Sequence, residues 1–570
     1  MLYGQTNVPI ELTLTAARPY ADVFNEIEVD VIWQAPSGEE RIVPAFWVGG
    51  SIFRARYASA EPGRHRYRTV CSNPQDAGLH GQTGELELAP YAGEHALYRH
   101  GRLRVAASRR TLEHRDGTPF FWLGDTWWYG LVQRLEWPQG FHTLVEDRVA
   151  KGFSLIQIVA GPLCDFDAEH DPWNPQQANE AGLSWEPGWA RINPRYYDLA
   201  DLRIAYLVER GLVPCIVSMW GYFLPYLGVR KVKQHWRNLV ARYGAYPVIW
   251  CLAGEVTMPT YSHIPLGGGS QDTTAESAAL AAGWTEVARY LRAVDPYHNP
   301  LCAHPWNPVS GRLALRDETL LDIDMLQTGH GGYPTLGFTV EQVAAAAARA
   351  PRMPVIDGEV NYEGIMGGSW QEVQRAAFWM CVTAGAAGHT YGAQGIWQMN
   401  SRSGPPHDGN TGSWGSGFWQ DAMNLPGSAQ VGLGRRFLER YPWWLFEPRP
   451  EPALPEGRLA PCATGIPGAL AIYYLPVNCI EDRLRGVDRG PFDGQFPRVT
   501  VEPGAHYQAY FFDPRTGADV PIGPVEPAGD GTWLVPRKPS MEDWVLVLED
   551  KEALASLTTF PISATLAPIE

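Results

Sequence analysis

The chain has 570 residues, of which 46 are Lys or Arg and 62 are Asp or Glu, so its net charge is −16. This length exceeds what one ordinary hydrophobic core supports, and we expect several domains. The negative charge argues against nucleic acid or an anionic membrane surface as a partner.

The first residues, MLYGQTNVPIELTLTA, contain neither the basic region nor the apolar region of a signal peptide. No apolar run in the sequence is long enough to cross a membrane. The sequence therefore predicts a cytoplasmic protein without membrane contact, or a secreted one if a leader has been removed.

Residues 8–90 alternate polar and apolar side chains in short runs, such as IELTLTA and IEVDVIW, separated by turn signals such as APSGEE. A period of two is typical of strands that bury one face. We expect an N-terminal β-sandwich over residues 1–100.

From residue 118 to 440, short apolar runs alternate with amphipathic helical stretches such as RKVKQHWRNLVARYG. Eight strands alternating with helices favour a (β/α)8 barrel over a doubly wound sheet, and no GxGxxG motif follows a strand. The fold class is therefore α/β, with a (β/α)8 TIM barrel over residues 101–442 flanked by N- and C-terminal β-sandwich domains. The expected barrel strands are 120–126, 154–161, 212–220, 248–255, 300–305, 325–331, 354–359 and 388–393.

After about residue 445 the alternation returns in ALAIYYL, HYQAYFFDPRTG and EDWVLVL, which predicts a C-terminal β-sandwich over residues 443–570. Neither junction contains a Pro/Ser-rich or Gly/Ser-rich linker, so we expect both sandwiches to dock on the barrel in a structural role. The C-terminal sandwich should cover Trp443, Trp444 and Phe446.

Two glutamates end strands of the predicted barrel: Glu255 ends the fourth and Glu359 the seventh. The carboxyl ends of all eight strands converge at one mouth, where the active sites of such barrels lie. Glycoside hydrolysis needs a carboxyl pair, because one group protonates the departing oxygen while the other attacks the sugar or activates water. Asp357 and Glu363, which flank Glu359, are expected in supporting or capping positions.

Other polar and aromatic residues at or near the strand ends are expected to bind the sugar, with Asp125 and the histidines fixing hydroxyl groups and the tryptophans forming apolar walls. The histidines could instead gather a zinc ion or be core residues, but no HExxH motif is present, and sugar contacts are favoured. We expect no metal and no cofactor. The predicted substrate-binding residues are Asp125, Trp127, Trp220, His304, His330, Tyr362, His389 and Trp397.

Several segments resemble the apiosidase-like glycoside hydrolases, and the resemblance covers nearly the whole chain. It implies an N-terminal sandwich, a catalytic (β/α)8 barrel and a carboxy-terminal sandwich of the collagen-binding type. It also implies a retaining enzyme in which Glu255 is the acid/base and Glu359 the nucleophile. The segments are GTPFFWLGDTWWYGL (117–131), CAHPWNP (302–308), GEVNYEG (358–364) and AYFFDPRTG with EDWVLVL near the end.

The fourth strand departs from the pattern of that family. This chain reads Ala253-Gly254-Glu255 where members of the family often read Gly-Gly-Asp, and Gly254 stands where related barrels carry Asn. The longer glutamate moves the proton donor, and the usual contact to a sugar 2-hydroxyl has to come from another residue.

Together these features predict a retaining exo-glycoside hydrolase that releases a terminal sugar, such as a pentofuranose or a deoxy sugar, from plant-type oligosaccharides or small glycosides. The alternative is a catalytically silent carbohydrate-binding protein. The tryptophans fit both hypotheses, whereas the two carboxylates favour the enzyme. A homo-oligomer is compatible with the sequence.

Overall fold

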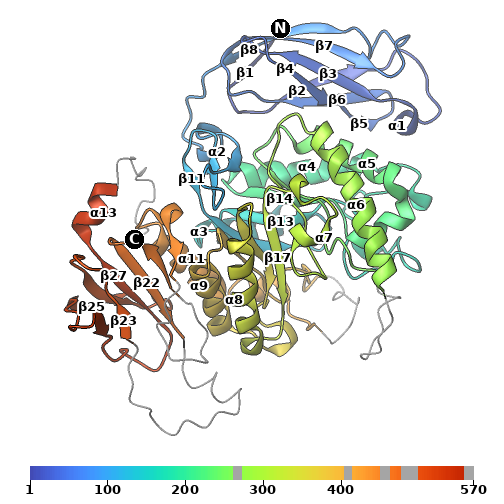
Figure 1. The fold of residues 1–570 in the computed structure, drawn as a ribbon. Helices are drawn as coiled ribbons and strands as arrows, with labels where there is room; N and C mark the ends of the chain where they lie inside the picture. The colour runs from blue at the N-terminus through green and yellow to red at the C-terminus, as the bar shows by residue number, and fades with distance from the viewer. Residues whose placement is uncertain (261–272, 404–413, 450–462, 477–497, 558–570) are drawn as a thin grey trace.

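The computed structural model describes residues 1–260, 273–403, 414–449, 463–476 and 498–557. Figure 1 shows a central barrel of strands and helices, with one β-rich domain above it and another at its side. The mixed α/β fold, with β-sandwich domains at both ends of the chain, is confirmed.

The N-terminal β-sandwich consists of a five-stranded sheet in the order β1-β8-β7-β3-β4 and a three-stranded sheet in the order β2-β6-β5. The predicted alternation of polar and apolar residues determines which side chains form its core. Val31 and Trp33 are fully buried, and the Trp33 ring stacks on Tyr57 with centroids 4.4 Å apart. The strands are β1 (Leu2–Gln5), β2 (Ile10–Thr15), β3 (Val29–Gln34), β4 (Glu40–Pro44), β5 (Phe46–Gly49), β6 (Ile52–Tyr57), β7 (Gly63–Cys71) and β8 (Thr83–Ala89). A short helix α1 (Val23–Glu26) lies between β2 and β3.

A small connecting sheet leads from this domain to the barrel. It follows α2 (Ala96–Arg99) and has the order β11-β10-β9, with β9 (Leu103–Val105), β10 (Leu112–His114) and β11 (Pro119–Phe120).

All eight predicted barrel strands are present. Six form one parallel sheet in the order β16-β15-β14-β13-β12-β19, and β17 pairs with β18. Backbone hydrogen bonds join the two sheets on both sides, among them those from Asp322 to Leu301 and from Ala387 to Val355, each at 2.8 Å. The strands are β12 (Trp122–Trp127), β13 (Leu155–Val159), β14 (Val213–Val217), β15 (Ile249–Cys251), β16 (Leu301–Cys302), β17 (Asp324–Gly329), β18 (Val355–Val360) and β19 (Gly388–Tyr391).

A helix follows each of these strands, which gives the chain the alternation of a (β/α)8 barrel. The main helices are α3 (Gln139–Ala150), α4 (Pro194–Glu209), α5 (Leu224–Tyr243), α6 (Thr274–Val294), α7 (Gly311–Ala314), α8 (Tyr333–Ala348), α9 (Gln371–Thr383) and α11 (Pro426–Leu438), with α10 (Trp419–Ala422) before the last. No helix among the described residues is both long and apolar enough to cross a membrane.

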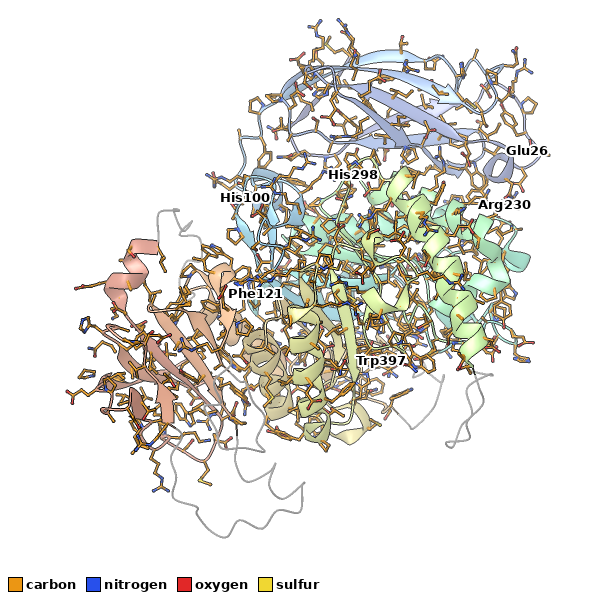
Figure 2. All side chains as sticks on the ribbon, in the orientation of Figure 1. Glu26, His100, Phe121, Arg230, His298 and Trp397 are labelled. Carbon is orange, nitrogen blue, oxygen red and sulfur yellow. The ribbon has the colours of Figure 1, made fainter. Side chains whose placement is uncertain are left out.

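The N-terminal sandwich packs against the end of the barrel where the strands begin. The hydroxyl of Tyr297, in the loop before β16, donates to the carbonyl of Arg56 at 3.2 Å, and Tyr297 is part of the sandwich core. Figure 2 shows His298 beside the sandwich, whereas Trp397, which follows β19, lies toward the opposite end of the barrel. The sandwich therefore leaves the carboxyl ends of the strands uncovered.

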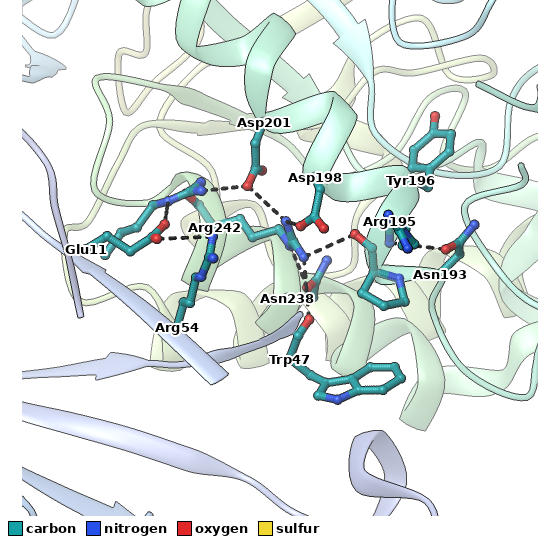
Figure 3. A network of polar contacts seen from close by, with 12 residues as sticks. Glu11, Trp47, Arg54, Asn193, Arg195, Tyr196, Asp198, Asp201, Asn238 and Arg242 are labelled. Atoms are coloured by element: carbon teal, nitrogen blue, oxygen red, sulfur yellow. Dashed lines mark hydrogen bonds and ion pairs between the residues drawn. The ribbon is translucent and has the colours of Figure 1, made fainter. Parts of the chain in front are cut away.

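Charged side chains also join this sandwich to the barrel (Figure 3). Arg56 donates to Asp201 of α4 at 2.6 Å, and Arg242 of α5 donates to the same carboxylate at 2.9 Å. Arg242 is fully buried and Arg56 nearly so.

The C-terminal β-sandwich packs against α9 and α11. A buried ion pair joins Arg375 of α9 to Asp543 at 2.6 Å, and Phe437 of α11 lies 4.4 Å from Phe512 between ring centroids. The six-stranded sheet has the order β20-β21-β22-β27-β24-β25 and a second sheet pairs β23 with β26. The strands are β20 (Glu447–Pro448), β21 (Ala463–Ile466), β22 (Leu470–Leu475), β23 (Arg498–Thr500), β24 (Gln508–Phe512), β25 (Asp519–Pro524), β26 (Thr532–Leu534) and β27 (Trp544–Glu549), followed by α13 (Lys551–Leu557).

Candidate active site

Glu255 and Glu359 meet at the carboxyl ends of β15 and β18. Glu255 is 9% exposed and Glu359 is 7% exposed, so both carboxylates are largely withdrawn from water. The backbone of Glu255 has a φ of 42°, in the left-handed region that a residue with a side chain rarely adopts. Such strain is typical of functional sites, where the surrounding structure holds a side chain in one orientation.

The side chain of Gln327, on β17, links the two carboxylates. Its amide nitrogen donates to Oε1 of Glu255 at 2.9 Å and to Oε1 of Glu359 at 3.4 Å. The two oxygens are therefore no farther apart than the sum of these distances, about 6.3 Å.

Two histidines contact the carboxylate of Glu359, one at each oxygen. Nε2 of His330 donates to Oε1 at 2.9 Å, and Nε2 of His304 lies 3.2 Å from Oε2. Burial alone would raise the pKa of Glu359, but the contacts and charges of His304 and His330 hold it well below the usual range of a carboxyl group. Glu359 is therefore ionised at neutral pH, as a nucleophile requires.

Glu255 has the opposite electrostatic environment. Burial, and then the charge of Glu359, raise the pKa of Glu255 to about 7. Its contacts are neutral donors: Nε1 of Trp220 donates to Oε2 at 2.9 Å, opposite the Gln327 contact at Oε1. Two carboxyl groups whose pKa values are driven apart can act as an acid and a nucleophile at the same pH.

Aromatic rings enclose this pair. The Trp128 ring meets Trp220 and His304 edge to face, each with centroids 5.4 Å apart. On the other side, the Tyr362 ring lies 4.6 Å from His330 and 6.2 Å from Trp397. Such walls suit the apolar faces of a sugar ring.

The structure brings together most of the predicted site residues: Glu255, Glu359, Trp220, His304, His330 and Tyr362, with Trp397 at the edge of the group through its contact with Tyr362.

Asp125 and Trp127 do not line this site, contrary to the sequence prediction. Arg148 of α3 donates to Asp125 at 2.6 Å, and the Trp127 indole donates to the same carboxylate at 2.7 Å. Side chains alternate along β12, so these two residues face the helical layer, while Thr126 faces the barrel interior and is within 3.3 Å of Gln157. Asp125 is a structural ion-pair partner.

His389 also lies away from the carboxylates. It is fully buried on β19 with its ring 5.6 Å from Phe378 of α9, and burial lowers its pKa to about 3. The three histidines thus do not converge, and no group of three or more His, Cys, Asp or Glu side chains in the described part of the chain could hold a metal ion.

The flanking acids have supporting contacts. Asp357, on β18, accepts from Thr328 of β17 at 2.6 Å. Glu363 accepts from Tyr391 at 2.6 Å and from the backbone N–H of Gly427 at 3.1 Å, which caps the first turn of α11. Both follow the supporting and capping positions predicted for them.

Sequence reasoning missed Gln327 and Trp128. Gln327 lies inside the predicted sixth strand, MLQTGHG, three residues before His330, and only residues at the strand ends were predicted to face the mouth. Trp128 follows directly after Trp127, and only the alternation of β12 decides which of the two faces inward. Placing Thr126 and Trp128 on the inner face would have required knowing that Asp125 pairs with α3.

Comparisons with known proteins show the family and the fold. A family model described as "Apiosidase-like, catalytic domain" matches residues 106–445, and one for a domain of unknown function (DUF5060) matches residues 7–72. No curated protein matches the chain significantly.

Three solved structures share the fold. One titled "Glycoside hydrolase" is 23% identical over 80% of this chain and 98% of its own, with a TM-score of 0.62. A glycoside hydrolase family 5 protein from Bacteroides vulgatus is 22% identical over 80% of this chain and 94% of its own, also with a TM-score of 0.62. Another structure from that organism is 15% identical, covers 96% of this chain and all of its own, and has a TM-score of 0.68.

Proposed function

Since the chain belongs to the apiosidase-like family of glycoside hydrolases, we propose that it is a retaining exo-glycosidase with Glu359 as nucleophile and Glu255 as acid/base. The separation of the two carboxylates carries the proposal. Retaining enzymes hold these groups about 5–5.5 Å apart, and inverting enzymes about 6.5–9.5 Å apart to admit a water molecule. The bound of about 6.3 Å set by Gln327 fits the shorter class.

In the first step, Glu359 attacks the anomeric carbon while the proton of Glu255 passes to the departing glycosidic oxygen. The C–O bond to the leaving group breaks and an ester to Glu359 forms. The charge of Glu359 is then lost, and with it the repulsion that helps to raise the pKa of Glu255. Glu255 thereby becomes a base that removes a proton from water as the ester is hydrolysed.

The enclosure of the pair supports cleavage of one terminal sugar. Both carboxylates are less than a tenth exposed, and the rings of Trp128, Trp220 and Tyr362 surround them. We propose a small terminal sugar as the residue released, such as a pentofuranose or a deoxy sugar, from a plant-type oligosaccharide or small glycoside. His304 and Tyr362 are the groups placed to contact its hydroxyls.

A panel of aryl glycosides, including pentofuranosides and deoxy sugars of both anomers, tests the proposal. We expect release from at least one, and proton NMR of the first product should show the anomeric configuration of the substrate. Initial formation of the opposite anomer would contradict retention. Glycan binding without release from any substrate would instead support a silent carbohydrate-binding protein.

A further inference from the structure

Gln327 combines two features at the carboxylate pair. Its amide nitrogen donates to Glu255 and Glu359, as described above, and its carbonyl oxygen is buried without a hydrogen-bond partner among the described residues. A buried acceptor without a hydrogen-bond partner costs about 1–3 kcal/mol. We therefore expect the carbonyl oxygen of Gln327 to accept a hydrogen bond in another state of the site.

Protonation of Glu255 produces such a state, because an acid/base residue is protonated in one step of the reaction and ionised in the other. The ionised carboxylate accepts hydrogen bonds at both oxygens, from Gln327 and from Trp220. A proton on Oε1 turns that oxygen into a donor, which opposes the N–H of Gln327. The indole of Trp220 can only donate a hydrogen bond, so it provides no acceptor for the proton of Glu255.

A primary amide can satisfy both forms, because rotation about its terminal bond exchanges the NH2 group and the carbonyl oxygen. The contact to Glu359 does not prevent this rotation. At 3.4 Å it is the longer of the two, and His330 still donates to the same Glu359 oxygen at 2.9 Å.

We propose that Gln327 is a positioning residue that serves both forms of Glu255 in the reaction. Its amide nitrogen donates to Glu255 when that residue acts as the base, and its carbonyl oxygen accepts from the Glu255 O–H when that residue acts as the acid. Gln327 itself gains and loses no proton. This inference rests on the proposed retaining function.

The other titratable groups near Glu255 do not take over this role from Gln327. Those facing it are Glu359 on β18, His304 after β16, Cys164 after β13 and Tyr222 after β14. Burial raises the pKa of Cys164 and of Tyr222 well above their usual ranges, so both stay neutral. The hydrogen bond from Gln327 lowers the pKa of Glu255, against the larger effects of burial and Glu359.

The test compares Gln327→Met with wild type on two substrates. An activated aryl glycoside makes ester hydrolysis rate-limiting, which needs the base, whereas an alkyl glycoside makes the first step rate-limiting, which needs the acid. We expect kcat to fall about 10- to 100-fold on both, because each form of Glu255 loses a hydrogen bond. The basic limb of kcat/KM should move to higher pH, because the hydrogen bond to the ionised form is the stronger of the two. A loss on only one substrate, or a limb that moves to lower pH, would overturn the two-form role.

A double-mutant cycle separates positioning from a structural role. In a Glu255→Gln background, Gln327→Met should cost less than about threefold, because the group it serves is gone; additive losses would overturn the proposal. Gln234→Met is the matched control, since Gln234 of α5 is also half-buried with an unpartnered carbonyl oxygen but lies at the N-terminal sandwich. It should leave kcat and the pH profile unchanged, and equal effects of the two variants would contradict the inference.

Failure of the proposed function gives a different result. If wild type releases no sugar, or the opposite anomer appears first, the retaining mechanism itself is wrong. If wild type is a retaining enzyme and Gln327→Met behaves like Gln234→Met, only the inference about Gln327 is wrong.

Discussion

Buried charges occur at both ends of the barrel, but they are compensated differently. At the strand beginnings, Asp201 is shared by Arg56 and Arg242, so each charge there faces an opposite one. At the strand ends, Glu255 and Glu359 face each other, and no Arg or Lys pairs with either among the described residues. Paired charges hold two domains together, whereas two carboxylates that have only histidines and neutral donors as partners keep their pKa values apart and remain available for chemistry.

The largest expected effect that tests this difference is at Glu359. Glu359→Gln should lower kcat on aryl glycosides at least about 10⁴-fold, because no other group can attack the sugar. The variant should still fold, because the amide oxygen of Gln can accept from His330 as the carboxylate does, and circular dichroism checks this. A stable variant with normal turnover would remove Glu359 from the mechanism.

At Glu255, the effect should depend on the leaving group. Glu255→Gln should slow hydrolysis of alkyl glycosides about 10²- to 10⁴-fold, because their leaving oxygen needs a proton. The first step should be nearly unchanged for activated aryl glycosides, as measured by the burst of released phenol. The same loss in both classes would argue against proton donation by Glu255.

The paired charges should show the reverse behaviour. Asp201→Asn removes the carboxylate that Arg56 and Arg242 share and leaves them only Glu11 and Asp198 as acidic partners. We expect the free energy of unfolding to fall by about 2 kcal/mol with kcat/KM unchanged. Asp519→Asn is the control, because its pair with Arg440 is about two-fifths exposed and should cost less than about 1 kcal/mol. Denaturant unfolding measures both. Equal costs would mean that burial does not distinguish the two pairs.

The smallest effect is a gradual one, in the pH profile. Glu255 must be protonated for the first step, so kcat/KM should be constant below its pKa of about 7 and fall about tenfold per pH unit above it. Because the pKa of Glu359 is depressed, the acid limb should lie below the usual range of a carboxyl group. A basic limb near pH 5 would show that Glu255 is not desolvated as the structure has it.

The sequence predicted the barrel strands and the carboxylate pair because both depend on local patterns. Apolar runs between amphipathic helices identify strands, and an acid at the end of such a run identifies the mouth. The errors at Asp125, Trp127 and His389 share one cause. Which face a strand residue presents depends on its partner in the helical layer, such as Arg148 for Asp125, and no local pattern contains that partner.

The docking of both sandwiches was predicted from the absence of a flexible linker at either junction, and the structure shows the contacts that hold them. Trp443, in the junction, packs on Phe121 beside β12 with centroids 5.0 Å apart, and Trp444 and Phe446 are half-buried. The C-terminal sandwich also contacts α9 and α11, where Trp379 and Phe437 meet Phe512. These helix residues are far from the junction in sequence, so the junction alone could not indicate them.

The cap that Glu363 places on α11 has a consequence for how such proteins recombine. Glu363 follows Glu359 by four residues and holds the first turn of α11, while Phe437 near the other end of that helix contacts the C-terminal sandwich. A gene fusion that exchanged this sandwich at the junction would keep α11 but remove the sandwich surface on which α11 packs. A crossover that carries the helix along would instead leave Glu363 without its partner. Inheritance of the barrel and its last domain as one unit therefore keeps both contacts of α11 intact.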